Sequence, residues 1–133
     1  MSRSDWARRF DEIFHRLLAR ESIDEFENDL SLIFEVIAET LLGGLPEWKG
    51  CYFDGAASLT SKKVTVRKIE FSGAMWVGKN RKQWTEPLRA TVTDKTRTKQ
   101  GVWIGLRVGK TFAESELWAA LDAREPTELK HLS

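Results

Sequence analysis

Residues 88–94 read LRATVTD and residues 102–108 read VWIGLRV, and in both stretches apolar side chains occupy every second position. Alternation with a period of two is typical of a β-strand that buries one face and exposes the other. The segment between the two stretches is polar. The pattern therefore predicts an antiparallel hairpin with one apolar face and one face in water.

Matching the apolar faces of this hairpin sets a register in which Thr91 opposes Trp103. Arg89 then opposes Gly105, and Arg107 lies one same-face step beyond it. Because glycine has no side chain, this register predicts a shallow notch flanked by Arg89, Trp103 and Arg107. A flat ring beside two guanidinium groups suits a planar or anionic group, since arginine donates bidentate hydrogen bonds to carboxylate and phosphate.

The N-terminal third of the chain has helical periodicity. One apolar stripe predicts a helix from about Ser4 to Arg20. The capping box at 22–25 predicts the start of a second helix, which ends at the paired glycines 43–44. Leu32 and Val36 form a second apolar strip beside the main stripe of that helix, which makes them candidates for self-association in a homodimer.

The remaining segments predict a loop, a sheet and a short helix. Residues 45–61 have the pattern of a long connecting loop with room for a short strand at 51–53, and residues 62–110 that of a basic antiparallel sheet. A change of phase at Arg67-Lys68 suggests a β-bulge. Residues 75–77 fit either a strand continued through Gly73 or a separate return strand. A capping box at 111–114 predicts a helix over 111–124, followed by a tail at 125–133.

Together these elements predict one α+β domain over residues 1–133. Residues 1–44 form a helical hairpin that packs on one face of a three- or four-stranded antiparallel sheet, and the short C-terminal helix completes a two-layer sandwich. The other face of the sheet is expected to stay in water.

Charge is unevenly distributed along the chain. Residues 1–61 carry 6 basic and 12 acidic side chains, residues 62–111 carry 13 and 3, and residues 112–133 carry 2 and 5. Such asymmetry is typical of a chain with an electrostatic role toward a partner or between its own layers. Besides the notch, the candidate binding residues are Arg67, Lys79, Arg81, Lys82, Lys95, Arg97 and Lys99.

The basic sheet face favours a small non-enzymatic binding or adaptor domain that engages an acidic macromolecular partner, in the first place an acidic protein. Nucleic acid is an alternative partner, because basic groups interleaved with aromatic rings also bind single strands. A small-molecule binder or enzyme centred on residues 45–61, with Cys51 as its thiol, is a third hypothesis. A purely structural role is a fourth, since charged side chains also protect sheet edges.

No residue pattern indicates catalysis, a metal or a cofactor. His15 and His131 are far apart and Cys51 is the single cysteine, so no cluster of metal ligands is expected. The glutamates of the second helix (Glu25, Glu35 and Glu39) are not expected to pair at catalytic spacing. No apolar run is long enough to span a bilayer, and the N-terminus lacks a signal-peptide pattern. The sequence thus predicts a cytoplasmic chain without a membrane partner, and no motif identifies a family.

Overall fold

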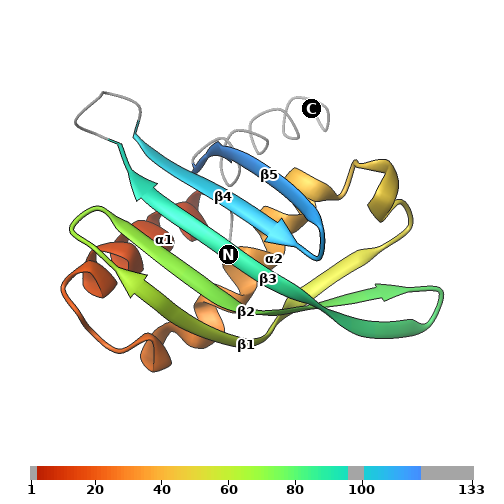
Figure 1. The fold of residues 1–133 in the computed structure, drawn as a ribbon, viewed down its shortest axis with the longest axis horizontal. Helices are drawn as coiled ribbons and strands as arrows, with labels where there is room; N and C mark the ends of the chain where they lie inside the picture. Colours follow the sequence, from red (N-terminus) through yellow and green to blue (C-terminus); the bar gives the residue numbers. More distant parts are fainter. Residues whose placement is uncertain (1–2, 96–100, 118–133) are drawn as a thin grey trace.

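The computed structural model describes residues 3–95 and 101–117. Its helical elements are α1 (Arg3–Leu18), the 3-10 turn η1 (Ile23–Phe26), α2 (Glu27–Leu42) and the 3-10 turn η2 (Pro46–Trp48). Its strands are β1 (Tyr52–Val64), β2 (Lys68–Lys79), β3 (Lys82–Asp94), β4 (Val102–Val108) and β5 (Thr111–Glu116). The strands pair antiparallel in the order β1-β2-β3-β4-β5, and both helices lie behind the sheet in Figure 1.

The predicted α+β class is confirmed, with two helices on one face of an antiparallel sheet, but the predicted size of the sheet is wrong. The described residues form five strands instead of three or four. Most of the expected loop at 45–61 belongs to β1. Only a short strand at 51–53 was considered in this loop. The pairing of β1 with β2 shifts register at three places, which removes any regular alternation of apolar side chains.

The prediction of a C-terminal helix over 111–124 is wrong for its first residues. Residues 111–116 form strand β5, which follows β4 after a tight turn and pairs with it from Thr111 to Glu116. The capping box predicted at 111–114 is therefore part of a strand, because pairing with β4 overrides the local helix signal. Residues 118–124 of the expected helix and the tail at 125–133 lie outside the described residues.

The middle of the chain consists of two hairpins. The change of phase at Arg67-Lys68 marks the turn between β1 and β2 instead of a bulge, because the amide of Thr65 donates to the carbonyl oxygen of Lys68 at 2.8 Å. β2 continues through Gly73 to Lys79, so residues 75–77 are not a separate strand. The basic segment after Gly78 is a tight β2–β3 turn, with residues 80 and 81 at φ 52° and 69°.

The core lies between the helices and the inner face of the sheet. The ring of Phe34 on α2 contacts those of Phe10 on α1 and Phe71 on β2, with centroid distances of 6.3 and 5.3 Å. The side chains that the central strands bury beside Phe71 are Ile69, Leu88, Ala90, Val92, Ile104, Leu106 and Val108. Within the part of the chain that the structure describes, no helix is long and apolar enough to cross a bilayer.

Gly73 allows β1 to lie unusually close to β2. A Cβ atom at this position would lie 1.9 Å from the carbonyl oxygen of Ser58 and 3.2 Å from the Cα of Leu59. Both obstacles are backbone atoms next to a register shift of β1, so they cannot move aside without distorting the strand. The glycine is thus a steric requirement of the irregular β1–β2 pairing.

We expect Gly73→Ala to lower the free energy of unfolding by about 2 kcal/mol or more, because overpacking against backbone forces the strands apart. Gly44→Ala is the matched control. A Cβ at Gly44 would meet no atom within 4 Å, so its effect should stay within about 0.5 kcal/mol. Urea unfolding of both variants measures the difference, and equal stabilities would contradict this account of the β1–β2 contact.

Candidate functional site

The predicted parity of the β3–β4 hairpin is confirmed, but its predicted register is wrong. Arg89 lies directly opposite Arg107, and Thr91 lies opposite Gly105. The expected register had placed Arg89 opposite Gly105. The difference is two residues, which leaves every apolar side chain on the inner face. Matching the apolar faces therefore could not distinguish the two registers.

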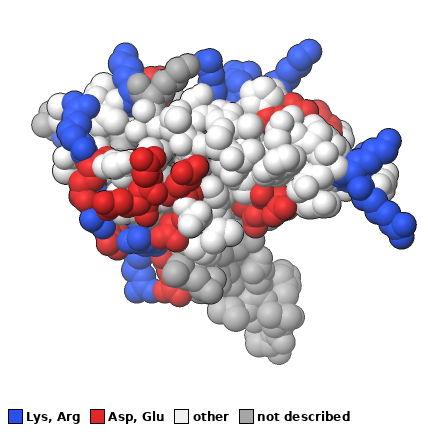
Figure 2. Space-filling view, turned by 90° about the horizontal axis from the view of Figure 1, so that it is seen from below, with Lys and Arg blue, Asp and Glu red and all other residues white. Residues whose placement is uncertain are grey.

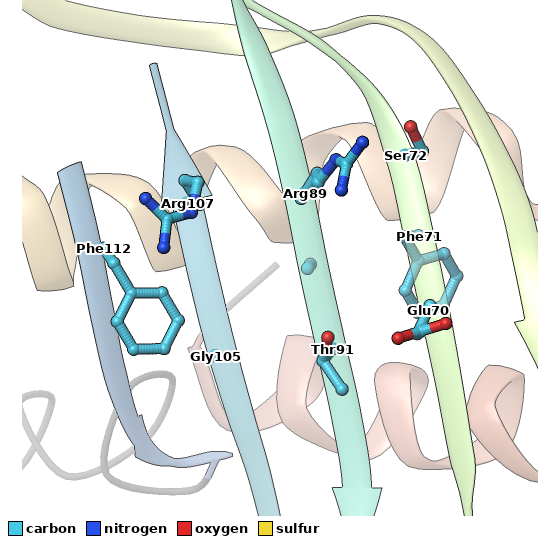
Figure 3. Close-up of a pocket in the computed structure, with 9 residues that line it drawn as sticks. Glu70, Phe71, Ser72, Arg89, Thr91, Gly105, Arg107 and Phe112 are labelled. Carbon is cyan, nitrogen blue, oxygen red and sulfur yellow. The ribbon is translucent and has the colours of Figure 1, made fainter. Parts of the chain in front are cut away.

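The face of the sheet that no described helix covers is called the bare face below. A hollow of about 210 Å³ opens on it around this pair (Figure 3). Strands β2, β3, β4 and β5 each contribute side chains to it. The residues that surround it are Glu70, Phe71, Ser72, Arg89, Ala90, Thr91, Gly105, Arg107 and Phe112. A hollow at Gly105 was predicted, and the structure places two guanidinium groups and one exposed ring around it.

Phe112, and not Trp103, is the ring beside the arginines. It pairs with Arg107 across β4 and β5, and its ring centroid lies 5.4 Å from the Arg107 Cζ. A Cβ at Gly105 would lie 3.1 Å from the Phe112 ring, which therefore leans over the glycine. Phe112 is 51% exposed. Phe112 was not predicted at this site, because the pattern of residues 111–114 indicates a helix.

The two arginines flank the hollow without converging on a single point. Figure 3 shows the Arg107 guanidinium directed toward Phe112 and the Arg89 guanidinium directed toward Ser72. Neither has an ion-pair partner among the described residues. Like charges on directly opposite residues destabilise a strand pair, so the divergent side chains reduce a repulsion that the pairing imposes.

Carboxylates also lie on this face, which is thus of mixed charge. Glu70 on β2 borders the hollow, and Glu114 on β5 lies opposite Gly105. Asp and Glu atoms nevertheless gather mainly on the side of the helices in Figure 2, while Lys and Arg atoms project along the sheet side and at the end of the β2–β3 hairpin. On this mixed face, Arg89 and Arg107 place two positive charges on directly opposite residues.

Trp103 lies two same-face steps from the arginine pair, beyond Gly105, and borders a smaller hollow of about 160 Å³. The Lys95 Nζ lies 5.4 Å from the Trp103 ring, within the range of a cation–π contact. Arg67 is near the same end of the sheet, because its carbonyl oxygen accepts a hydrogen bond from the Asp94 amide at 2.8 Å. These residues extend the surface away from the arginine pair.

The remaining predicted binding residues are not part of this cluster. Lys79, Arg81 and Lys82 lie at the tip of the β2–β3 hairpin, where Lys79 is seven residues along β2 from Ser72. That separation is roughly 23 Å along the strand. Arg97 and Lys99 lie outside the described residues.

The apolar strip expected on the second helix is only partly exposed. Val36 packs against the core, whereas Leu32 is 45% exposed. A single exposed leucine is ordinary on a protein surface. These two residues therefore do not form an apolar patch that would by itself support a homodimer.

The helix glutamates are closer to other acids than expected. Glu35 and Glu39 on α2 lie near Asp54 at the start of β1, and Glu39 accepts a hydrogen bond from the Phe53 amide at 3.1 Å. Burial raises the pKa of Glu35, and the negative charges of Asp54 and Glu39 raise it further. Among the described residues, no three His, Cys, Asp or Glu side chains form a group that could hold a metal ion.

We expect Glu35→Gln to stabilise the fold at pH 7 by a few tenths of a kcal/mol, since solvent screens this half-buried charge. The folded-state pKa is raised, so ionised Glu35 destabilises the fold above it. That penalty disappears as the pH falls below the unfolded-state value of 4.5. Urea unfolding should therefore show the gain at pH 7 but not near pH 4. The same gain at both pH values would contradict a raised pKa of Glu35 as its cause. Glu47→Gln, at an exposed position, is the control and should show no such gain.

Comparison of the chain with models of known protein families, with curated proteins and with solved structures found no match. The arginine pair, its hollow and the ring of Phe112 are thus the features from which a function can be argued.

Proposed function

We propose that the chain is a non-enzymatic binding domain whose bare sheet face engages an acidic protein, with Arg89 and Arg107 at the centre of the contact. The observation that supports this most is the position of the two arginines. They are directly opposite each other, border one hollow, and have no ion-pair partner among the described residues. An anionic group placed between them would turn their mutual repulsion into attraction for the partner.

The chemistry of the two side chains suits carboxylate groups. Each guanidinium presents parallel N–H donors that match the two oxygens of a carboxylate. The Phe112 ring lies against the Arg107 guanidinium, which restricts that side chain before a partner arrives. A side chain that is ordered in advance loses less conformational entropy on binding.

The surroundings favour an acidic protein over nucleic acid. Glu70 and Glu114 stand on either side of the arginine hollow, where a continuous row of phosphates would meet them. A protein can instead present isolated carboxylates between apolar groups. The half-exposed ring of Phe112 offers an apolar contact of the kind that is enriched in protein interfaces.

The other basic residues have supporting roles in this proposal. Trp103 and Lys95 extend the contact toward the β1–β2 turn, where Arg67 adds a further charge. The cations at the β2–β3 tip are too far away to share a contact with the arginine pair. They contribute to the long-range field that attracts an acidic partner.

A labelled poly-L-glutamate peptide tests the proposal by fluorescence anisotropy at low salt. We expect Arg89→Gln with Arg107→Gln to weaken binding about tenfold or more, because both central donors are lost. The matched control is Arg81→Gln with Lys82→Gln, which removes the same charge at the hairpin tip. It should weaken binding by less than about threefold, since it alters only the long-range field.

Equal losses in the two double variants would show that the peptide senses net charge and not the arginine pair. A short single-stranded oligonucleotide is the competing probe. If it binds more tightly than the peptide and depends on the same two arginines, the nucleic-acid alternative replaces the acidic protein.

Removing one member of the pair should not weaken the fold. We expect Arg107→Gln to leave the free energy of unfolding unchanged or to raise it by up to about 0.5 kcal/mol, because the repulsion with Arg89 is relieved. Urea unfolding measures this change. A clear loss of stability would mean that the arginines serve the fold, as the structural hypothesis holds.

A further inference from the structure

A second and larger hollow, of about 530 Å³, lies at a different place in the fold. Its walls come from η2, the residue before β1, the β2–β3 hairpin and the β4–β5 turn. Trp84 and Glu86 on β3 border this hollow. They pair with Val77 and Met75 of β2, which are buried, so their side chains project from the inner face of the sheet. The arginine pair is on the outer face, so the two hollows are separate.

Two indole rings from distant parts of the sequence line this hollow. Trp48 on η2 is 7% exposed and packs against Phe53, with 5.4 Å between the ring centroids. Trp84 on β3 is half-buried. Both rings are thus held by the fold while part of the hollow remains open between the segments that carry them.

Glu86 is a fixed carboxylate in the same hollow. Its Oε1 accepts a hydrogen bond from the Trp84 Nε1–H at 2.9 Å. Its Oε2 lies 2.8 Å from where a Cβ at Gly109 would stand, and Gly109 has a φ of 61°. Glu86 has no ion pair with any described residue. A half-buried negative charge, oriented by an indole, is therefore left without a cationic partner.

We propose that this hollow binds an alkylammonium group. The face of an indole ring is electron-rich and attracts a cation, and the attraction increases as the cation loses water. Glu86 supplies the countercharge next to the Trp84 ring. The combination of indole rings and a carboxylate is selective, because it favours a cation over a neutral group of the same shape and repels an anion.

The lysines at the rim give the proposal a discriminating test. Lys79 and Lys110 also border the hollow, and both are exposed on flexible stems. They would assist an anionic ligand but oppose a cationic one. Removing either charge should therefore tighten the binding of an alkylammonium group, whereas it would weaken the binding of an anion.

A free amine and a lysine side chain of another protein share this chemistry, so the experiment uses one probe for each source. Choline represents the free amine, and Nα-acetyl-lysine amide represents the side chain. The neutral isostere 3,3-dimethyl-1-butanol controls for apolar contact alone. Binding is followed by tryptophan fluorescence and by the indole N–H signals in NMR spectra.

We expect saturable binding of at least one cation, and at least about fivefold weaker binding of the neutral isostere. Glu86→Gln keeps an oxygen that can accept from Trp84 but removes the charge. It should weaken binding about tenfold or more, because the countercharge is lost. Glu114→Gln, exposed on the outer face of the sheet, is the matched control and should change binding less than about threefold. Lys110→Gln should tighten it.

Binding of choline alone would assign the site to a free quaternary amine, and binding of the lysine probe alone would assign it to a protein side chain. The proposal is overturned if neither cation saturates or if the neutral isostere binds equally well. It is also overturned if Glu86→Gln has no more effect than Glu114→Gln, or if Lys110→Gln weakens binding. None of these outcomes bears on the arginine pair.

Discussion

The packing of Phe34 on α2 against Phe71 on β2, with 5.3 Å between the ring centroids, determines which side of the sheet meets water. Successive side chains of a strand point to opposite faces, so burying Phe71 directs Ser72 outward. The pairing of β2 with β3 and of β3 with β4 transmits this choice to Arg89 and Arg107. The proposed contact surface thus depends on a constraint in the core behind it.

The same constraint explains why two like charges stand opposite each other. Arg89 and Arg107 each lie between buried residues of their strand and therefore point outward. The register of β3 with β4 places them directly opposite each other. A sheet can accommodate this because the side chains diverge into water and because Phe112 lies against one of them. Neither arginine has an ion-pair partner among the described residues, and the proposed binding role would provide one.

Regular periodicity made part of this fold predictable from the sequence. The stripes of α1 and α2 and the alternation of β3 and β4 gave the class, the helical layer and the water-facing side of Arg89, Arg107 and Trp103. The register could not be obtained in this way, because a slip of two residues keeps every side chain on its own face. Because the predicted register was off by two residues, it placed Trp103 beside the arginines, where the structure has Phe112.

The segments that were missed have weak local signals. β1 is irregular and relies on contacts with β2 that include the close approach at Gly73. β5 begins with a sequence that also fits a helix cap, and only its pairing with β4 decides between the two. The hollow between Trp48 and Trp84 joins residues that are far apart in the sequence, so local patterns could indicate that segment 45–61 was of interest but not what faces it.

The most direct test of the central claim is a disulfide cross-link across β3 and β4 in a Cys51→Ser background. Directly opposite residues lie within the distance that a disulfide can bridge, whereas a diagonal pair lies near or beyond its limit. Arg89→Cys with Arg107→Cys should therefore form an intramolecular disulfide on mild oxidation, and Arg89→Cys with Gly105→Cys should not. Efficient cross-linking of the second pair, with none in the first, would contradict the register that brings the two arginines together.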